Sequence, residues 1–157
     1  MKCILSLSLV VITVSATVAH ADTAIFAGGC FWCVEALYQE AEGVSNAVSG
    51  FTGGTHPSPT YNGSHDGHFE AVLVTYDPKQ VSYQQLLDLF WVNVDPLDNS
   101  GQFCDKGFSY RSAIFVANDE ERELAVASKK KAEVEFAGQE VFTEILAATK
   151  FFPVEEY

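Results

Sequence analysis

Basic residues are scarce in this sequence. Only 9 of its 157 residues are lysine or arginine, against 21 aspartates and glutamates, which gives a formal net charge of −12. A protein that binds nucleic acid needs a basic face, and the one basic run, residues 129–131, is most simply the solvated face of a helix. The charge balance therefore argues against nucleic acid and other anionic partners.

The sequence also lacks internal repeats and low-complexity segments, and it is too short for two ordinary domains. Hydrophobic residues make up 48% of it and charged residues 19%. These proportions exclude a disordered chain and predict a single globular domain with a hydrophobic core.

Residues 1–21 are typical of a secretory signal peptide. Lys2 supplies the positive start, residues 4–18 are mostly apolar, and Ala19-His20-Ala21 matches an A-x-A cleavage site. The apolar part is too short and too rich in serine and threonine to span a bilayer comfortably, and the alternative is an uncleaved anchor. We expect a secreted or periplasmic protein, free of the membrane after cleavage, whose functional domain spans residues 22–157.

Cysteines are few, and their number is odd once the signal peptide is removed. Cys3 lies before the apolar core and leaves with the signal, so Cys30, Cys33 and Cys104 remain. Small secreted proteins that depend on disulfides carry an even set of cysteines. A set of three is typical of reactive thiols instead.

The motif Gly28-Gly29-Cys30-Phe31-Trp32-Cys33 stands between residues 23–27, which predict a buried strand, and residues 34–40, which predict a helix. Glycine permits backbone angles that other residues avoid and lets a ligand come close. Cys30 falls at or near the first helical position, where free N–H groups and the helix dipole favour the nucleophilic thiolate. Cys33 lies one turn further on the same face, within reach of a disulfide with Cys30.

The spacing alone leaves several interpretations open. A C-x-x-C pair can perform redox or nucleophilic chemistry, form half of a zinc site, or simply pack in the core. A periplasmic thiol–disulfide oxidoreductase using Cys30 and Cys33 is the strongest alternative enzyme, although Phe31 and Trp32 are bulky for that class. A zinc site lacks a second C-x-x-C and would need Cys104 and a histidine. The candidates for that histidine are His56, His65 and His68.

The hydrophobic pattern predicts an alternation of strands and helices. We expect strands at residues 23–27, 43–51, 68–76, 111–116 and 143–146, and helices at 34–40, after the N-cap Ser82, and over about 18 residues after the N-cap Asn118. Two long loops, residues 52–67 and 95–109, are of a length that is usually functional. The core order predicts a single α/β (α+β) domain with a ferredoxin-like split βαβ core, that is, a mixed, mostly antiparallel sheet flanked by helices.

Four polar residues are candidates for a site around the C-x-x-C pair. Glu70 is a carboxylate inside an apolar strand, where desolvation would raise its pKa and keep it protonated near neutral pH, unless strand alternation points it to solvent. Tyr61 and Tyr110 lie in or beside the two long loops and can donate an O–H or merely pack. Asp105 can bind a backbone amide or water, or serve the turn of its loop.

Five stretches of the chain carry a specific resemblance. They are the Gly28–Cys33 motif, SGFTGG at 49–54, PTY at 59–61, GHFEAV at 67–72, and GQFCDKG at 101–107 running into YRSAIF at 110–115. In this order they resemble the peptide methionine sulfoxide reductases of the A class, and the resemblance covers nearly all of residues 23–157. It implies the same α/β architecture and a peptide-methionine (S)-S-oxide reductase, which repairs oxidised proteins.

The resemblance also implies roles for the candidate residues. Cys30 is the nucleophile that attacks the sulfoxide sulfur, and Glu70 is the proton donor to the sulfoxide oxygen. Tyr61 and Tyr110 hold that oxygen. Asp105 completes the expected substrate site.

Phe31 and Trp32 would form a flat apolar pocket for the terminal S-methyl group of the substrate, unless they are ordinary core. The expected partners are oxidised proteins or peptides that contain methionine sulfoxide, with the free amino acid as a further substrate. No bound metal, flavin or nucleotide is required. An external dithiol of the thioredoxin type is the expected reductant, and we expect a monomer.

The expected cycle passes through a sulfenic acid on Cys30, which a second thiol converts to a disulfide and water before the external dithiol resets the enzyme. Many family members have glycine in place of Cys33 and carry recycling cysteines in a C-terminal tail, which the present sequence does not include. Because Cys33 is nearest in sequence, we expect it to be the resolving thiol, with Cys104 as the alternative.

Overall fold

The computed structural model describes residues 21–155. The predicted signal peptide, residues 1–21, therefore lies outside the described part apart from Ala21. Within residues 21–155, no helix has the length and hydrophobicity that a membrane crossing requires.

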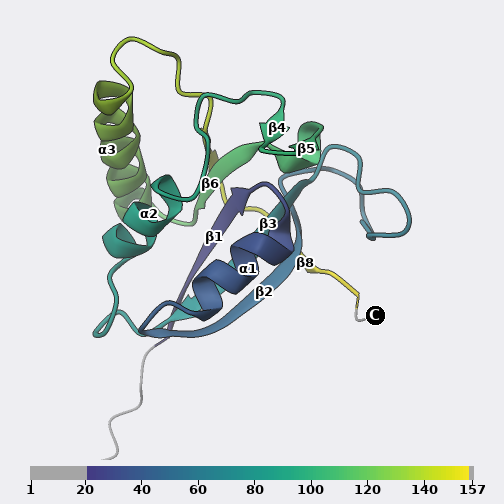
Figure 1. Cartoon of the computed structure of the whole chain (residues 1–157). Coiled ribbons are helices and arrows are strands. Elements are labelled where there is room, and N and C mark those ends of the chain that lie inside the picture. Colours follow the sequence, from purple (N-terminus) through teal and green to yellow (C-terminus); the bar gives the residue numbers. More distant parts are fainter. Residues whose placement is uncertain (1–20, 156–157) are drawn as a thin grey trace, which may run out of the picture.

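Strands and helices alternate through the chain as the hydrophobic pattern predicts (Figure 1). In order, the described elements are β1 (Asp22–Gly28), α1 (Phe31–Gln39), β2 (Val44–Thr52), β3 (Phe69–Tyr76), α2 (Tyr83–Trp91), β4 (Gly101–Gln102), β5 (Asp105–Lys106), a 3-10 turn (Phe108–Tyr110), β6 (Ser112–Val116), α3 (Asp119–Glu135), β7 (Glu144–Ala147) and β8 (Phe152–Pro153).

The main sheet has the strand order β7-β6-β1-β3-β2-β8. All its pairings are antiparallel except that between β6 and β7, which the crossover helix α3 connects in parallel. The central four strands, β6-β1-β3-β2, with α1 and α2 as their connections, form the ferredoxin-like split βαβ arrangement. The fold class predicted from the sequence is confirmed.

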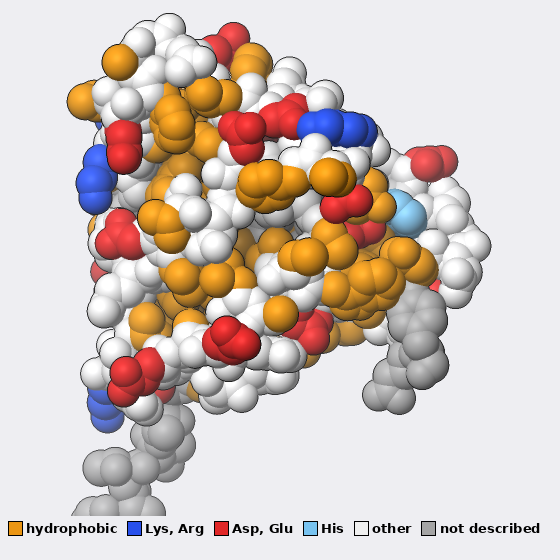
Figure 2. Space-filling model, viewed as in Figure 1, with side chains coloured by type: hydrophobic (Ala, Val, Ile, Leu, Met, Phe, Trp, Pro, Cys, Tyr) orange, Lys and Arg blue, Asp and Glu red, His pale blue; other side chains and the backbone are white. Residues whose placement is uncertain are grey.

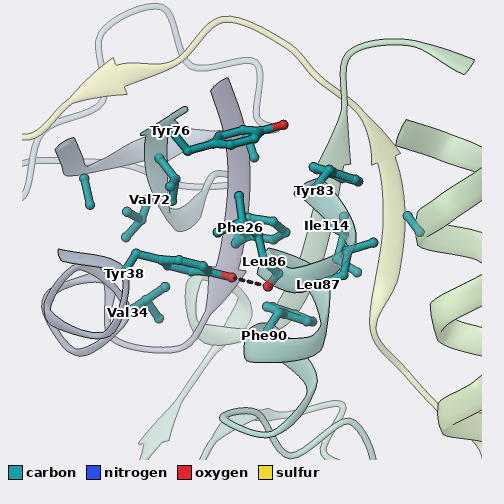
Figure 3. Close-up of a cluster of buried hydrophobic side chains, with 14 of the residues drawn as sticks. Phe26, Val34, Tyr38, Val72, Tyr76, Tyr83, Leu86, Leu87, Phe90 and Ile114 are labelled. Carbon is teal, nitrogen blue, oxygen red and sulfur yellow. Dashed lines mark hydrogen bonds between the residues drawn. The ribbon is translucent and has the colours of Figure 1, made fainter. Parts of the chain in front are cut away.

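All three helices contribute to the core on one face of this sheet. Phe26 of β1 lies at the centre, with its ring 5.0 Å from that of Tyr38 on α1 and 5.7 Å from that of Phe90 on α2 (Figure 3). The Tyr38 hydroxyl donates to the carbonyl oxygen of Leu86 at 3.2 Å, which links the two helices. Burial raises the pKa of Tyr38 well above its ordinary value, so this donor stays protonated.

Residues on the opposite face of the sheet form a smaller core, because strand side chains alternate between faces. Its sheet residues are mostly small, as at Ala27, Ala71 and Ala113. The segment around β7 and β8, including Leu146 and Phe151, packs against them. Bulky helices thus cover one face, and the C-terminal strands and their connection cover the other.

The N-caps predicted for the second and third helices are both present. The Ser82 side chain accepts from the N–H of Gln85, and the Gln85 side chain accepts from the N–H of Ser82. The two bonds form a capping box. Asn118 accepts from the N–H of Glu121 at 2.9 Å. Three acidic residues in the first turn of α3 suit the positive end of its dipole.

Two features differ from the sequence expectation. The predicted loop 95–109 contains the β4–β5 hairpin and the 3-10 turn, and β8 adds an edge strand beside β2. Both strands of the hairpin and β8 are two residues long, too short to show a periodicity. β8 also contains Pro153, which lowers the strand propensity of its sequence.

Candidate active site

The turn between β1 and α1 places Cys30 at the N-cap of the helix. Gly29 makes this turn with a φ of +94°, and a Cβ atom at Gly29 would lie 2.7 Å from the Cβ of Gln102. Both the backbone angle and the close approach therefore require glycine. Cys30, at the end of this turn, is half-buried, whereas Cys33 is exposed.

The N-terminus of α1 is held by a residue distant in sequence. The Cys30 side chain makes no capping hydrogen bond. Instead, the N–H of Phe31 donates to Glu70 Oε2 on β3 at 3.1 Å. An N–H of the first helical turn, which has no partner within the helix, thus finds its hydrogen-bond acceptor in a strand carboxylate directly beside Cys30.

Glu70 is only 1% exposed, although it carries a carboxyl group. Its neighbour Val72 belongs to the helix-covered core and Ala71 to the opposite core, so alternation places Glu70 on the helix-covered face. The alternative that Glu70 points to solvent is therefore wrong. Burial raises the pKa of Glu70, and the nearby Asp105 adds to the rise, while the Phe31 N–H and two further neighbours partly oppose it.

Tyr110 and Asp105 approach the same carboxyl group. The Tyr110 phenol lies near enough to Glu70 to moderate the rise in the pKa of that carboxyl. Burial raises the pKa of Tyr110 itself, and Glu70 and Asp105 add to this rise, so the phenol remains a donor. The predicted loop 95–109 therefore brings Asp105 to the start of α1, and Tyr110, directly after it, lies there too.

Aromatic side chains form a wall beside Cys30. The rings of Trp32 and Tyr61 lie 5.0 Å apart, and Phe31 lies 5.0 Å from Trp32 and 6.0 Å from Tyr61. Phe31 is fully buried and packs on Phe51, whereas Trp32 is 43% exposed. Trp32 and Tyr61 thus present the apolar surface, and Phe31 supports them from behind. Figure 2 shows hydrophobic side chains gathered over this end of α1, with acidic side chains among them.

The two cysteines of the motif contact each other. The N–H of Cys33 donates to the carbonyl oxygen of Cys30 at 3.1 Å. Burial raises the pKa of Cys33, and its neighbours Cys30 and Asp105 add to the rise. The raised pKa favours the protonated thiol at Cys33, one helical turn from Cys30. Cys104 is exposed on the turn between β4 and β5.

The histidines do not fit the zinc alternative. Both ring nitrogens of the buried His68 bond to backbone groups: Nδ1 accepts from the N–H of Gly54 at 3.2 Å, and Nε2 lies 3.1 Å from the carbonyl oxygen of His56. His65 stacks on Phe51. Across residues 21–155, no group of three or more His, Cys, Asp or Glu residues is arranged to hold a metal ion.

Comparison with known proteins agrees with this geometry. A family model described as peptide methionine sulfoxide reductase matches residues 22–157. The chain belongs to that family. The peptide methionine sulfoxide reductase MsrA of Bacillus licheniformis is 46% identical over 140 residues, which are 87% of this chain and 77% of that protein. MsrA 2 of Rhizobium meliloti is 44% identical over 143 residues, covering 90% of this chain and 72% of that protein.

Solved structures of this reductase family share the fold. Methionine sulfoxide reductase A of Corynebacterium diphtheriae matches with a TM-score of 0.74 and 33% identity, over 86% of this chain and 70% of that chain. Mxr1 from Saccharomyces cerevisiae in its reduced form matches with a TM-score of 0.78 and 26% identity, over 96% of this chain and 88% of that chain. The enzyme class predicted from the sequence, a peptide methionine sulfoxide reductase, is confirmed, and the oxidoreductase and zinc alternatives are set aside.

Sequence reasoning missed residues that hold this reductase site together. Gln102 is buried, and its side chain bonds the N–H and the carbonyl of Asp95 while packing against Gly29. Glu155 accepts from the N–H of Tyr61. Gln102 lies inside a stretch that carried the resemblance, which is the signal that could have pointed to it. Glu155 stands in a short acidic end with no pattern of its own.

Proposed function

We propose that this methionine sulfoxide reductase is thiol-dependent, acts on the S epimer, and uses Cys30 as nucleophile and Glu70 as proton donor. One observation carries the proposal: the buried Glu70 carboxyl, whose pKa is raised, bonds the first N–H of the helix that Cys30 begins. A carboxylic acid with a raised pKa and a thiol at a helix N-terminus are the two groups that reduction of a sulfoxide requires.

In the proposed reaction, the Cys30 sulfur attacks the sulfoxide sulfur while Glu70 protonates the sulfoxide oxygen. The attack forms a bond between the Cys30 sulfur and the substrate sulfur. The protonated oxygen then transfers to Cys30, so that this S–S bond and the S–O bond of the substrate both break and Cys30 becomes a sulfenic acid. The substrate sulfur gains two electrons and leaves as methionine, and Cys30 loses two. Tyr110, which lies near Glu70, donates a hydrogen bond to the same oxygen. Because Phe31 is fully buried, the S-methyl group is assigned to the surface of Trp32 and Tyr61, and Tyr61 takes this role in place of holding the oxygen.

The proposed cycle then passes through a disulfide. The Cys33 thiol displaces hydroxide from the Cys30 sulfenic acid, its proton completes a water molecule, and the Cys30–Cys33 disulfide forms. An external dithiol supplies two electrons and two protons to restore both thiols. Mxr1 of Saccharomyces cerevisiae, whose fold this chain shares, has been solved in complex with Trx2. A thioredoxin-type protein is accordingly the proposed reductant.

Variants at Cys33 and Cys104 test the route of reduction. With thioredoxin as reductant, the wild type and Cys104→Ser should turn over many times, whereas Cys33→Ser should release about one methionine per enzyme. Dithiothreitol, which can reach a sulfenic acid directly, should restore multiple turnovers to Cys33→Ser. If Cys104→Ser stalls and Cys33→Ser does not, Cys104 is the resolving thiol.

A paired assay tests the reaction class. The wild type should reduce a peptide methionine S-sulfoxide, leave the R epimer unchanged, and fail to accelerate insulin disulfide reduction by dithiothreitol. Insulin reduction without sulfoxide reduction would replace the proposal with a thiol–disulfide oxidoreductase.

We also propose that the enzyme works outside the cytoplasm after removal of residues 1–21, because these residues have the charge, apolar run and cleavage pattern of a secretory signal. N-terminal sequencing of the protein recovered from the periplasm or medium should begin at Asp22. A full-length chain retained in the cytoplasm would contradict this.

A further inference from the structure

The loop between β2 and β3 depends on side chains from elsewhere to keep its shape. It contains four glycines and two prolines in residues 53–67, and it carries Tyr61. At its base, the N–H of Gly53 donates to Thr149 Oγ1 at 3.1 Å, and His68 accepts from Gly54. Within the loop, the N–H of Thr60 bonds the carbonyl of Ser64 at 3.3 Å. A loop with so many glycines needs such anchors to present a side chain at one fixed position.

The anchor at Tyr61 itself is Glu155. The N–H of Tyr61 lies 3.1 Å from Glu155 Oε1 and 3.3 Å from Oε2, so both carboxylate oxygens share one donor. The two residues are 94 positions apart in the chain. Bonds to an ionised carboxylate are stronger than neutral ones, so this contact is suited to hold the loop.

Glu155 can act as an anchor because the strand before it is fixed to the sheet. β8 pairs with β2 at Gly50 and Phe51, and the N–H of Val154 donates to the carbonyl of Ser49 at 3.0 Å. A Cβ atom at Gly50 would lie 2.4 Å from the carbonyl oxygen of Phe152, so glycine allows β8 to dock this closely. Figure 1 shows the chain leaving β8 on the same side of the sheet as the β2–β3 loop.

The anchored residue is the one that packs on the exposed aromatic of the site. The Tyr61 ring lies 5.0 Å from that of Trp32 and 6.0 Å from that of Phe31. Because the bonded N–H belongs to Tyr61 itself, a displacement of this backbone group moves the ring. The position of the Tyr61 ring, one of the two aromatic surfaces proposed to receive the S-methyl group, therefore depends on the contact with Glu155.

We propose that Glu155 is a positioning residue, which fixes the Tyr61 ring against Trp32 and thereby sets the affinity of the enzyme for the methionine sulfoxide side chain. This rests on the proposed function of Trp32 and Tyr61 as the substrate pocket. Glu155 is exposed and touches no reacting atom. Its effect is on substrate binding and not on the chemical step.

Kinetics with a matched control test the proposal. Glu155→Ala should raise KM for N-acetyl-methionine-S-sulfoxide methylamide by about threefold to tenfold and leave kcat within about twofold, because the lost contact positions the pocket and not the reacting groups. Glu155→Gln keeps an oxygen acceptor and should restore most of the loss. Glu42→Ala, which removes an exposed carboxylate from the turn after α1, should change neither constant.

Two further measurements separate this inference from the proposed function. In the Cys30→Ser background, the Kd for the same sulfoxide, followed by tryptophan fluorescence, should rise by a similar factor when Glu155 is replaced by Ala. The amide proton of Tyr61 should shift in Glu155→Ala and not in Glu42→Ala, whether or not the enzyme turns over. An unchanged KM and Kd in Glu155→Ala, or a parallel fall in kcat and thermal midpoint, would overturn the positioning role. Absence of sulfoxide reduction by the wild type would instead overturn the proposed function.

Discussion

Of the three described α-helices, two have a side-chain N-cap and one does not. α2 and α3 are capped by their own neighbouring residues, Ser82 and Asn118, whose side chains accept first-turn N–H groups. α1 begins at Cys30, which makes no such bond, and its first N–H is taken by Glu70 from a strand. The N-termini of α2 and α3 are thus capped by residues next to them in sequence. The N-terminus of α1, which carries the reactive motif, has no such cap and faces the site.

This difference has an energetic side. A good N-cap stabilises a helix by about 1 kcal/mol relative to a non-capping residue. α1 gives up this local contribution and relies on the burial of Phe31, Val34 and Tyr38 against the sheet. The comparison predicts that changes at the start of α1 alter activity far more than stability, and that changes at the other two caps do the reverse.

The largest expected effect is that of Cys30→Ser. It should abolish methionine sulfoxide reduction, because a serine hydroxyl does not provide the soft nucleophile of a thiolate. The same change should leave stability unchanged or raise it by up to about 1 kcal/mol, because serine is a preferred N-cap. Steady-state activity and urea unfolding measure the two effects. A variant that retains activity, or one that loses both activity and stability, would break the comparison.

Glu70→Gln comes next. It should lower kcat by roughly 10²–10⁴-fold, the usual contribution of a general acid. In the wild type, kcat should fall as pH rises through the raised pKa of Glu70, because only the protonated carboxyl can donate. That descending limb should disappear in Glu70→Gln.

The same carboxyl gives a stability prediction with a definite sign. The pKa of Glu70 is raised by folding, so its favourable contribution is present at low pH and is lost as pH rises through the folded-state pKa. Unfolding free energy of the wild type should therefore fall relative to that of Glu70→Gln as pH increases. A difference that is constant with pH would contradict the raised pKa.

Tyr110→Phe should have a smaller effect that sharpens this assignment. Removing one hydrogen-bond donor should lower kcat by about threefold to tenfold. The Tyr110 hydroxyl also holds the pKa of Glu70 down, so its loss should move the descending limb of the kcat profile to higher pH. A limb that moves to lower pH would show that Tyr110 does not lower the pKa of Glu70.

Asn118→Ala should leave activity unchanged. Loss of the cap at α3 should cost about 1 kcal/mol of stability, which corresponds to roughly 2–4 °C in the thermal midpoint of a domain of this size. The cap bonds Glu121 in a helix that begins away from the α1 turn. A reduced kcat in this variant would show that the two kinds of helix start are not separate in function.

The parts of the fold that the sequence predicted correctly are those specified by neighbouring residues. The helix starts at Ser82 and Asn118 follow from side chains that bond backbone groups three positions away. The strand containing Glu70 has a run of β-branched and apolar residues. The placement of Cys30 followed from two glycines between a strand and a helix. In each case the cause and its effect lie within one turn or one strand.

The parts that were missed depend on residues far apart in the chain. β8 forms because Gly50 leaves room for it, and Glu155 acts on a residue 94 positions earlier. The buried side chain of His68, at the end of the β2–β3 loop, bonds backbone groups of Gly54 and His56 near the start of that loop. The choice between an exposed and a buried Glu70 was also open, because alternation alone does not say which face of a strand the helices cover. Such long-range contacts leave no local pattern to detect.

The central claim is that the Cys30 sulfur takes the oxygen from the substrate. It can be tested by exposing the Cys33→Ser/Cys104→Ser enzyme to one equivalent of peptide methionine S-sulfoxide in the presence of dimedone, followed by mass spectrometry of the tryptic peptides. We expect one dimedone adduct, on Cys30, for each methionine formed. Methionine formed in full yield with Cys30 unmodified and still reduced would contradict the account.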